Sequence, residues 1–173
     1  HIPPNKLFSF AEFNGRLEEL TFFLFNKAAA EIKKFLSVNP DQKFATNLAP
    51  SLISNLSLPD RLVNLIRVHG LRLENFSFEV TETSILNLEP VTLEVLSRMR
   101  IYGFDVAIDD FGTGSSNIQT LRDFPYSELK IDRTFISNAT TDTFSRETVH
   151  AAVTLAKEQN MKVVAEGVEN MES

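Results

Sequence analysis

Residues 104–109 read FDVAID, a short apolar run with a polar residue at its carboxyl end, and runs of this kind recur along the chain. The others are KFATNL at 43–48, FSFEVT at 76–81, SELKID at 127–132 and MKVVAE at 161–166. Short runs rich in β-branched and aromatic residues, bounded by turn residues, are typical of β-strands. The sequence therefore predicts five strands.

Helical patterns separate these runs. Over residues 16–36, apolar side chains recur every three or four positions, at Leu17, Leu20, Leu24, Ala28, Ile32 and Phe35. This spacing predicts an amphipathic helix. Further helices are expected at about 59–69 with Gly70 as its C-cap, from Pro90 to the residue before Gly103, and over 144–159. Strands that alternate with helices are typical of parallel βα units, so the expected class is α/β.

The spacing of the strands limits the architecture. Their centres lie near residues 45, 78, 107, 130 and 164, which gives roughly 30 residues to each βα unit. Eight units would need about 240 residues, close to the size of a (β/α)8 barrel. The chain has 173 residues. Two architectures stay open at this point, a doubly wound open sheet and most of a barrel with its ends cut off.

Composition excludes several kinds of partner and site. The chain has 17 Lys and Arg and 23 Asp and Glu, which gives a net charge of −6. Non-specific DNA or RNA binding needs clustered basic residues, so the sequence argues against it. There is no cysteine, which excludes disulfides and thiol catalysis and fits a reducing, cytoplasmic compartment. No apolar run approaches the ~20 residues of a membrane span, so we expect no membrane segment in this chain.

Polar residues collect where the predicted strands end. One or two lie at the end of each strand: Asn47; Glu79 and Glu82; Asp109 and Asp110; Lys130 and Asp132; Glu166 and Glu169. Any one of them could be a helix cap or a solvated loop residue. Helix capping does not readily explain polar residues at the ends of five consecutive strands, because Glu, Lys and paired acids are not preferred caps. Both open architectures bind ligands at this rim of the sheet.

The residue types at this rim favour a hard cation. Carboxylate and amide oxygens, without imidazole or thiolate, suit Mg²⁺ or Mn²⁺. Asp109 and Asp110 are adjacent, and two carboxylates do not readily stay ionised together without a cation. A carboxylate that bridges two metals would hold them ~3.5–4 Å apart, a spacing used in phosphodiester cleavage. Lys130 could orient the attacking hydroxide or neutralise charge on the phosphoryl oxygens.

A glycine-containing segment follows the paired aspartates. Residues 111–117 read FGTGSSN, which matches Gly-x-Gly-x-x-Asn and not the dinucleotide-binding pattern, since Asn117 takes the place of the third glycine. We expect Gly112, Thr113 and Gly114 to shape a mobile loop over the rim instead.

Six stretches together resemble motifs of the EAL-domain family, bacterial phosphodiesterases that linearise cyclic di-GMP. They are HIPP at 1–4 with the Phe-rich helix after it, TNLA at 46–49, EVTET at 79–83, DDFGTG at 109–114, LKIDR at 129–133 and AEGVE at 165–169. The resemblance implies a TIM-like (β/α)8 barrel of the EAL type with a metal site at its carboxyl-terminal rim. It resolves the choice of architecture toward an incomplete barrel.

The resemblance also implies a role for each rim residue. Asn47, Glu79 and Asp109 would bind one Mg²⁺ or Mn²⁺ ion, and Asp109 would bridge to a second ion held by Asp110 and Glu166. Lys130 would hold the water nucleophile, with Asp109 and Glu166 beside it as the other catalytic residues. The remaining implied residues are Glu82, Gly112, Thr113 and Gly114, which position the loop, and Asp132 and Glu169, which lie beside the substrate.

The chain departs from the family pattern at its ends. The Glu-Ala-Leu strand that names the family would precede Ile2, and a final strand would follow Glu169. We therefore expect residues 1–173 to be a single EAL domain truncated at both ends, with weak or no activity by itself. Within the loop, Ser115 replaces the usual Tyr.

The expected function of the parent domain is metal-dependent hydrolysis of cyclic di-GMP to linear pGpG in bacterial signalling. The alternative is a catalytically inactive EAL-type receptor that binds cyclic di-GMP and changes dimer or domain contacts. A scaffold that binds neither metal nor nucleotide is disfavoured, because it has little reason to keep these residues.

The expected partners are a second copy in a homodimer and a sensory or GGDEF-type domain elsewhere in the protein. The expected location is the cytoplasm, free or as the cytoplasmic part of a membrane-attached protein.

Overall fold

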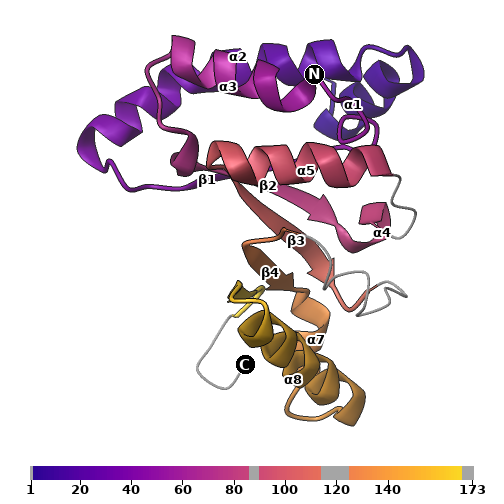
Figure 1. The fold of residues 1–173 in the computed structure, drawn as a ribbon. Helices are drawn as coiled ribbons and strands as arrows, with labels where there is room; N and C mark the ends of the chain where they lie inside the picture. Colours follow the sequence, from indigo (N-terminus) through magenta and orange to yellow (C-terminus); the bar gives the residue numbers. More distant parts are fainter. Residues whose placement is uncertain (1, 86–89, 114–124, 169–173) are drawn as a thin grey trace.

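The computed structural model describes residues 2–85, 90–113 and 125–168, and its centre is a five-stranded parallel sheet (Figure 1). The strands are β1 (Phe44–Asn47), β2 (Phe76–Thr81), β3 (Asp105–Phe111), β4 (Glu128–Ile131) and β5 (Lys162–Ala165). They lie in the order β1-β2-β3-β4-β5, and every neighbouring pair is parallel. A doubly wound sheet would reverse its strand order at a switch point, so this sequential order is that of an incomplete barrel.

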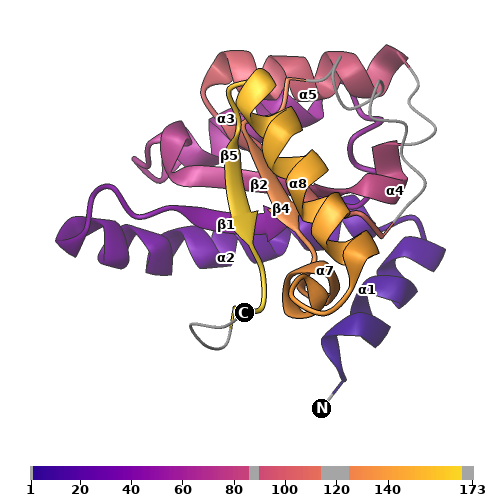
Figure 2. The ribbon, with the colours of Figure 1, turned by 90° about the horizontal axis from the view of Figure 1, so that it is seen from below.

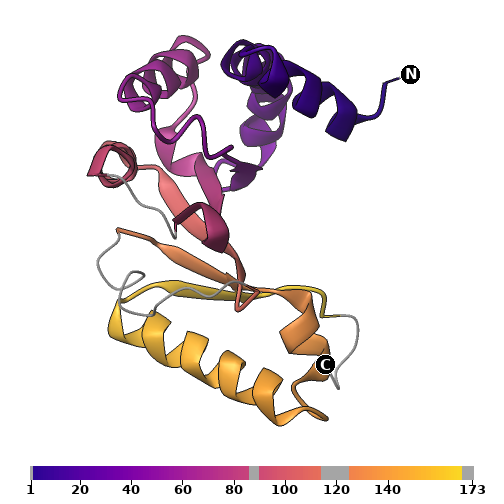
Figure 3. The ribbon, with the colours of Figure 1, turned by 90° about the vertical axis from the view of Figure 1, so that its right-hand side faces the viewer.

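All five strands lie within two residues of their predicted limits. The long helices are α2 (Leu17–Val38), α3 (Leu58–Val68), α5 (Pro90–Tyr102) and α8 (Thr143–Glu158), and each was expected. Among the shorter elements, α1 (Pro4–Phe13) begins at the end of HIPP, where the family resemblance places a Phe-rich helix. The others were not expected: η1 (Leu73–Asn75), α4 (Glu82–Ile85) and α7 (Arg133–Asn138). Figure 3 shows the long helices in an arc around the outside of the curved sheet. Among the described residues, no helix has the length and apolar character needed to span a bilayer.

The core fills the layer between the sheet and these helices. The outward residues of the central strands are fully buried, among them Phe78, Val106, Ile108 and Leu129. They pack against buried residues of three helices, including Leu62 and Ile66 of α3, Leu96 and Met99 of α5, and Ala152 of α8. Figure 2 shows α8 lying along β4 and β5, the two strands it contacts. Since side chains alternate along a strand, the opposite face of the sheet is left for the polar residues.

The inward face of α2 was predicted only in part. Leu17 is buried and Ile32 packs against the core, as expected, but Phe35 is 66% exposed and Leu24 and Ala28 are exposed as well. Buried Ala29 faces the core instead, with partly buried residues beside it: Phe22, Phe25, Ile32 and Leu36. The reason is that LTFFLF at residues 20–25 is apolar around most of the helix, so the spacing alone does not select one side.

Candidate active site

The sheet places the predicted rim residues on its concave, inner face. Asn47 of β1 lies opposite Glu79 of β2 in the register, and Thr81 lies opposite Asp109 of β3. Glu79 and Thr81 share one face because they are two residues apart on the same strand. Asn47, Glu79 and Asp109 therefore face the same side, the side opposite the buried Phe78 and Ile108.

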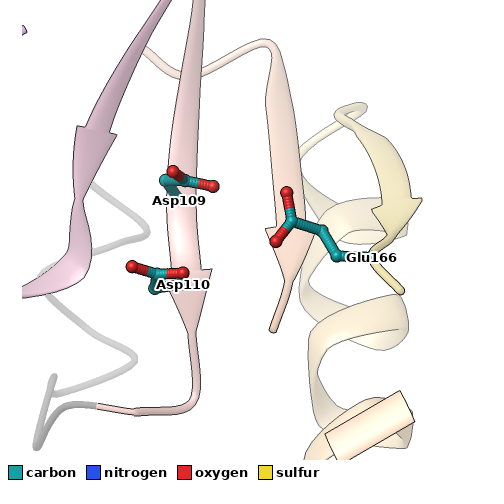
Figure 4. A group of neighbouring side chains, drawn as sticks. All are labelled: Asp109, Asp110 and Glu166. Carbon is teal, nitrogen blue, oxygen red and sulfur yellow. The ribbon is translucent and has the colours of Figure 1, made fainter. Parts of the chain in front are cut away.

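An irregularity in β3 brings the next carboxylate to the same place. Consecutive residues of a regular strand point to opposite faces, which would separate Asp109 from Asp110. The pairing of β3 with β4 shifts between Ile108 and Phe111, and Asp110 has a φ of 56°. This left-handed residue in a β-bulge turns the chain. Figure 4 shows the result, with the carboxylates of Asp109 and Asp110 both near that of Glu166.

These three carboxylates form a group that could hold a metal ion. One oxygen from each of Asp109, Asp110 and Glu166 lies within 4.8 Å of the other two. Burial raises the pKa of Asp110, and repulsion from Asp109, Asp132 and Glu166 raises it further. A cation placed among the three would relieve that repulsion. The donor set, all carboxylate oxygen, fits a hard divalent cation such as Mg²⁺ or Mn²⁺.

Lys130 lies at the centre of a second set of contacts. Its Nζ lies 2.7 Å from Asp109 Oδ1, 3.0 Å from Glu79 Oε1 and 2.6 Å from Glu166 Oε1. The Lys130 side chain is 14% exposed. Burial alone would lower its pKa, but the hydrogen bonds to Asp109, Glu166 and Glu79 outweigh that effect and raise the pKa above its ordinary value. Lys130 is therefore a permanent ammonium at neutral pH.

A pocket extends from this group toward β1. It has a volume of about 630 Å³, and Asn47, Glu79, Thr81 and Ser84 contribute to its wall, together with apolar residues such as Phe8. Asn47 itself is exposed. Its position beside Glu79 agrees with the expected placement, and its role as a metal ligand stays a prediction.

The loop-positioning residues are held by hydrogen bonds. Glu82 is 3% exposed, and its Oε2 accepts a hydrogen bond of 2.9 Å from the backbone N–H of Gly112. The hydroxyl of Thr113 donates to the carbonyl oxygen of Asp110 at 2.8 Å. The turn after β3 is thus tied to α4 and closed on itself. Gly114 lies outside the described residues.

The structure describes one of the two residues expected beside the substrate. Asp132 is the N-cap of α7, since its Oδ1 accepts a hydrogen bond of 2.8 Å from the N–H of Thr134. One of its oxygens is therefore engaged by the helix. Glu169 lies outside the described residues.

Two contacts near the site were not predicted from the sequence. Gly112 packs against Phe135 and Thr148, and Gly167, directly after Glu166, packs against Arg133. The sequence signal for these contacts is the position of the two glycines. Gly112 lies two residues after Asp110, and Gly167 directly follows Glu166.

Comparison with known proteins agrees with this geometry. The family model described as EAL domain matches residues 1–173. The cyclic di-GMP phosphodiesterase RocR of Pseudomonas aeruginosa is 32% identical over 171 residues, which cover 99% of this chain and 44% of RocR. The bifunctional diguanylate cyclase/cyclic di-GMP phosphodiesterase MucR of the same species is 32% identical over 169 residues, 97% of this chain and 25% of MucR.

A solved structure shows the same fold. The PaMucR phosphodiesterase in complex with c-di-GMP superimposes with a TM-score of 0.87 at 32% identity, covering 99% of this chain and 70% of that one. The chain spans less than half the length of the two curated relatives. The family match, the relatives and the parallel sheet with its carboxylate rim agree: the chain belongs to the EAL-domain family.

Proposed function

We propose that these residues form the catalytic rim of a metal-dependent phosphodiesterase that hydrolyses cyclic di-GMP to the linear dinucleotide pGpG. The observation that carries the proposal is the juxtaposition of the Lys130 ammonium with carboxylates from β2, β3 and the segment after β5. Support comes from RocR and MucR, both named as cyclic di-GMP phosphodiesterases.

In this proposal the rim holds two Mg²⁺ or Mn²⁺ ions. Asp110 and Glu166 would bind one of them, Asn47 and Glu79 the other, and Asp109 would contribute to both. Bound there, the ions would stabilise the negative charge that develops on the phosphoryl oxygens during cleavage. The group of three carboxylates within 4.8 Å supports the first of these sites.

Lys130 acts as a hydrogen-bond donor and a fixed positive charge. Because its pKa is raised, it cannot serve as a general base at neutral pH. Its three N–H donors are shared among the carboxylates of Asp109, Glu79 and Glu166. When metal ions bind these carboxylates, one donor would be free to hold a water beside Asp109 and Glu166. Glu166 is the most exposed of the carboxylates around Lys130, at 29%, and it can accept the proton that this water loses.

The surrounding residues position the rim and the substrate. Glu82 holds the turn at Gly112 and Thr113, which follows Asp110, and Gly114 is expected to have the same positioning role. Asp132 and Glu169 would lie beside the dinucleotide. The pocket next to Asn47 and Glu79 gives the nucleotide access to the rim.

The test is turnover of cyclic di-GMP by the complete EAL domain that contains these residues, with Mg²⁺ or Mn²⁺. Hydrolysis to pGpG is expected, and Asp109→Asn and Lys130→Ala are expected to lose it. Matched controls are Asp41→Asn and Lys34→Ala, whose side chains are 91% and 71% exposed and which should retain activity. Binding of cyclic di-GMP without turnover by the wild type would refute the enzyme and favour the receptor.

We also propose an oligomeric state, a location and an accompanying domain for the protein. We expect a homodimer in the cytoplasm and a sensory or GGDEF-type domain in the same protein. The relative MucR is named as a bifunctional diguanylate cyclase/cyclic di-GMP phosphodiesterase, so it has a second activity beside the phosphodiesterase. Residues 1–173 alone are expected to turn over cyclic di-GMP weakly or not at all. In the described sheet, β1 and β5 are edge strands and do not pair with each other, so the rim is open on the Asn47 side.

A further inference from the structure

Two glycine turns carry the carboxylates of the metal-binding group. Gly112 lies two residues after Asp110 with a φ of 100°, and Gly167 follows Glu166 directly with a φ of 68°. Both angles fall in the left-handed region, which glycine adopts without steric cost. The two turns lie at the ends of β3 and β5, the strands on either side of β4.

Both turns pack against the helix that follows β4. A Cβ atom built on Gly112 would lie 2.6 Å from Cε2 of Phe135 and 2.9 Å from the Thr148 methyl Cγ2. A Cβ atom built on Gly167 would lie 2.6 Å from Cβ of Arg133. Such distances mean that the ring edge and the methylene group lie directly on the glycine backbone. The first turn of α7 therefore lies between the Asp110 turn and the Glu166 turn.

The helix α7 is itself firmly placed. Asp132 caps it through Thr134, and Ile136 is buried. The N–H of Glu166 donates a hydrogen bond of 3.1 Å to the carbonyl oxygen of Ile131, at the end of β4 just before the helix. The Phe135 ring also contacts the ring of Phe144 at a centroid distance of 6.1 Å, but Phe144 is exposed and is not needed for this placement. Phe135 therefore packs on Gly112 from a helix that directly follows the strand end hydrogen-bonded to Glu166.

We propose that Phe135 is a positioning residue for the metal site. By packing its ring edge on Gly112, whose N–H also donates a hydrogen bond to Glu82, it holds Asp109 and Asp110 close enough to Glu166 for the three carboxylates to share one divalent cation. The inference rests on the proposed function for the identity of the site. The new claim is that Phe135, an apolar side chain that cannot itself bind a metal ion, sets the affinity of the site for the metal.

The experiment compares Mn²⁺ binding by electron paramagnetic resonance in three variants. Phe135→Leu keeps an apolar side chain and removes the ring edge; Phe135→Tyr keeps that edge and serves as the rescue. Phe144→Leu is the matched control, because this exposed ring contacts Phe135 and is not among the atoms nearest to a Cβ built on Gly112. We expect the Mn²⁺ dissociation constant of Phe135→Leu to rise about tenfold, the lower end of the effect of residues that support metal ligands. Phe135→Tyr and Phe144→Leu should bind as the wild type does.

A metal-free measurement and a kinetic one complete the test. Amide hydrogen exchange at Gly112 should be faster in Phe135→Leu than in Phe144→Leu, and the turnover lost by Phe135→Leu should return at higher Mn²⁺ concentration. If Phe135→Leu does not fold, Phe135→Met replaces it. That variant also removes the ring edge against Gly112 and keeps a long apolar side chain.

The outcomes separate the two proposals. Unchanged Mn²⁺ affinity in a folded Phe135→Leu protein overturns the role of Phe135, whatever the reaction is. A wild type that binds Mn²⁺ and does not hydrolyse cyclic di-GMP overturns the proposed function, while the affinity comparison still decides the role of Phe135. A wild type that binds no Mn²⁺ overturns both.

Discussion

Lys130 Nζ donates a hydrogen bond of 2.7 Å to Asp109 Oδ1 across the β3–β4 pair. The same ammonium contacts Glu79 and Glu166, so a single positive charge joins carboxylates from three parts of the sheet. Like charges that share a site repel strongly unless a cation lies between them. The rim is therefore held together by Lys130 before any metal binds, and its carboxylates are already in place.

Replacing Lys130 should separate binding from catalysis. Lys130→Met keeps much of the length of the side chain and removes the charge. We expect turnover of cyclic di-GMP to fall by about 10²–10³-fold, as when a donor to the reacting group is lost. Mn²⁺ should bind more tightly, because one competing cation has been removed. Steady-state kinetics and Mn²⁺ titration measure the two effects, and a variant with wild-type turnover would exclude Lys130 from the reaction.

The carboxylate of Glu82 should matter as a hydrogen-bond acceptor. Glu82→Ala leaves the partly buried N–H of Gly112 without its partner, which costs about 1–3 kcal/mol. We expect a lower unfolding free energy by this amount and a drop in kcat, because the Asp110 turn loses its support. Glu82→Gln keeps an acceptor oxygen and is the matched comparison. Equal losses in the two variants would show that the charge of Glu82 is required as well as its acceptor.

The sequence was sufficient to predict which residues lie at the rim. It was not sufficient to predict the backbone geometry that brings their side chains together. The strand ends at Asn47, Glu79 and Lys130 followed from local apolar runs and from the rule that parallel strands end at one edge. The approach of Asp110 to Asp109 did not follow, because period-two alternation places neighbours on opposite faces. It depends on a bulge and a positive φ at an aspartate, which only the finished sheet determines.

The elements that were missed are short and owe their position to tertiary contacts. The helix α7 has six residues and α4 has four, too few for apolar spacing to show a face. Their contacts with Gly112 join segments far apart in sequence, from Glu82 on one side to Phe135 on the other. The inward face of α2 was predicted only in part for a different reason, since apolar residues surround most of that helix.

The ion pairs of Asp105 should make stability depend on pH. Asp105 lies on the inner face below the rim, with Lys43 as an ion-pair partner and Arg100 at 3.1 Å. Burial alone would raise the pKa of Asp105, but the hydrogen bond and charge of Lys43 outweigh burial and hold the pKa below its ordinary value. A lowered folded-state pKa stabilises the protein above the unfolded-state pKa of about 3.9. That stabilisation is lost as the pH falls through the folded-state pKa.

Urea unfolding at pH 7 and at progressively lower pH measures this contribution. We expect Asp105→Asn to be less stable than the wild type at pH 7 and to lose less stability on acidification. The control is Asp41→Asn, whose side chain is 91% exposed and which should follow the wild type at every pH. If Asp105→Asn followed the wild-type curve at a constant offset, protonation of Asp105 would not contribute to acid unfolding.

The contact between Gly167 and Arg133 can be separated from the backbone angle at Gly167 by a comparison within the chain. Gly15 has a φ of 66°, against 68° for Gly167, and a Cβ atom at Gly15 would meet no atom within 4 Å. Alanine at either position has the strain of a left-handed residue, about 1–2 kcal/mol. Only Gly167→Ala also places a methyl group against the Cβ of Arg133.

We therefore expect Gly167→Ala to lower the unfolding free energy by more than Gly15→Ala does, and to weaken Mn²⁺ binding, which Gly15→Ala should leave unchanged. The weaker binding follows because the methyl group pushes the turn away from α7, and Glu166 is the residue before that turn. Chemical denaturation and Mn²⁺ titration of the two variants give the comparison. Equal effects on both measurements would mean that the backbone angle alone requires glycine at residue 167, and that α7 does not fix the position of Glu166.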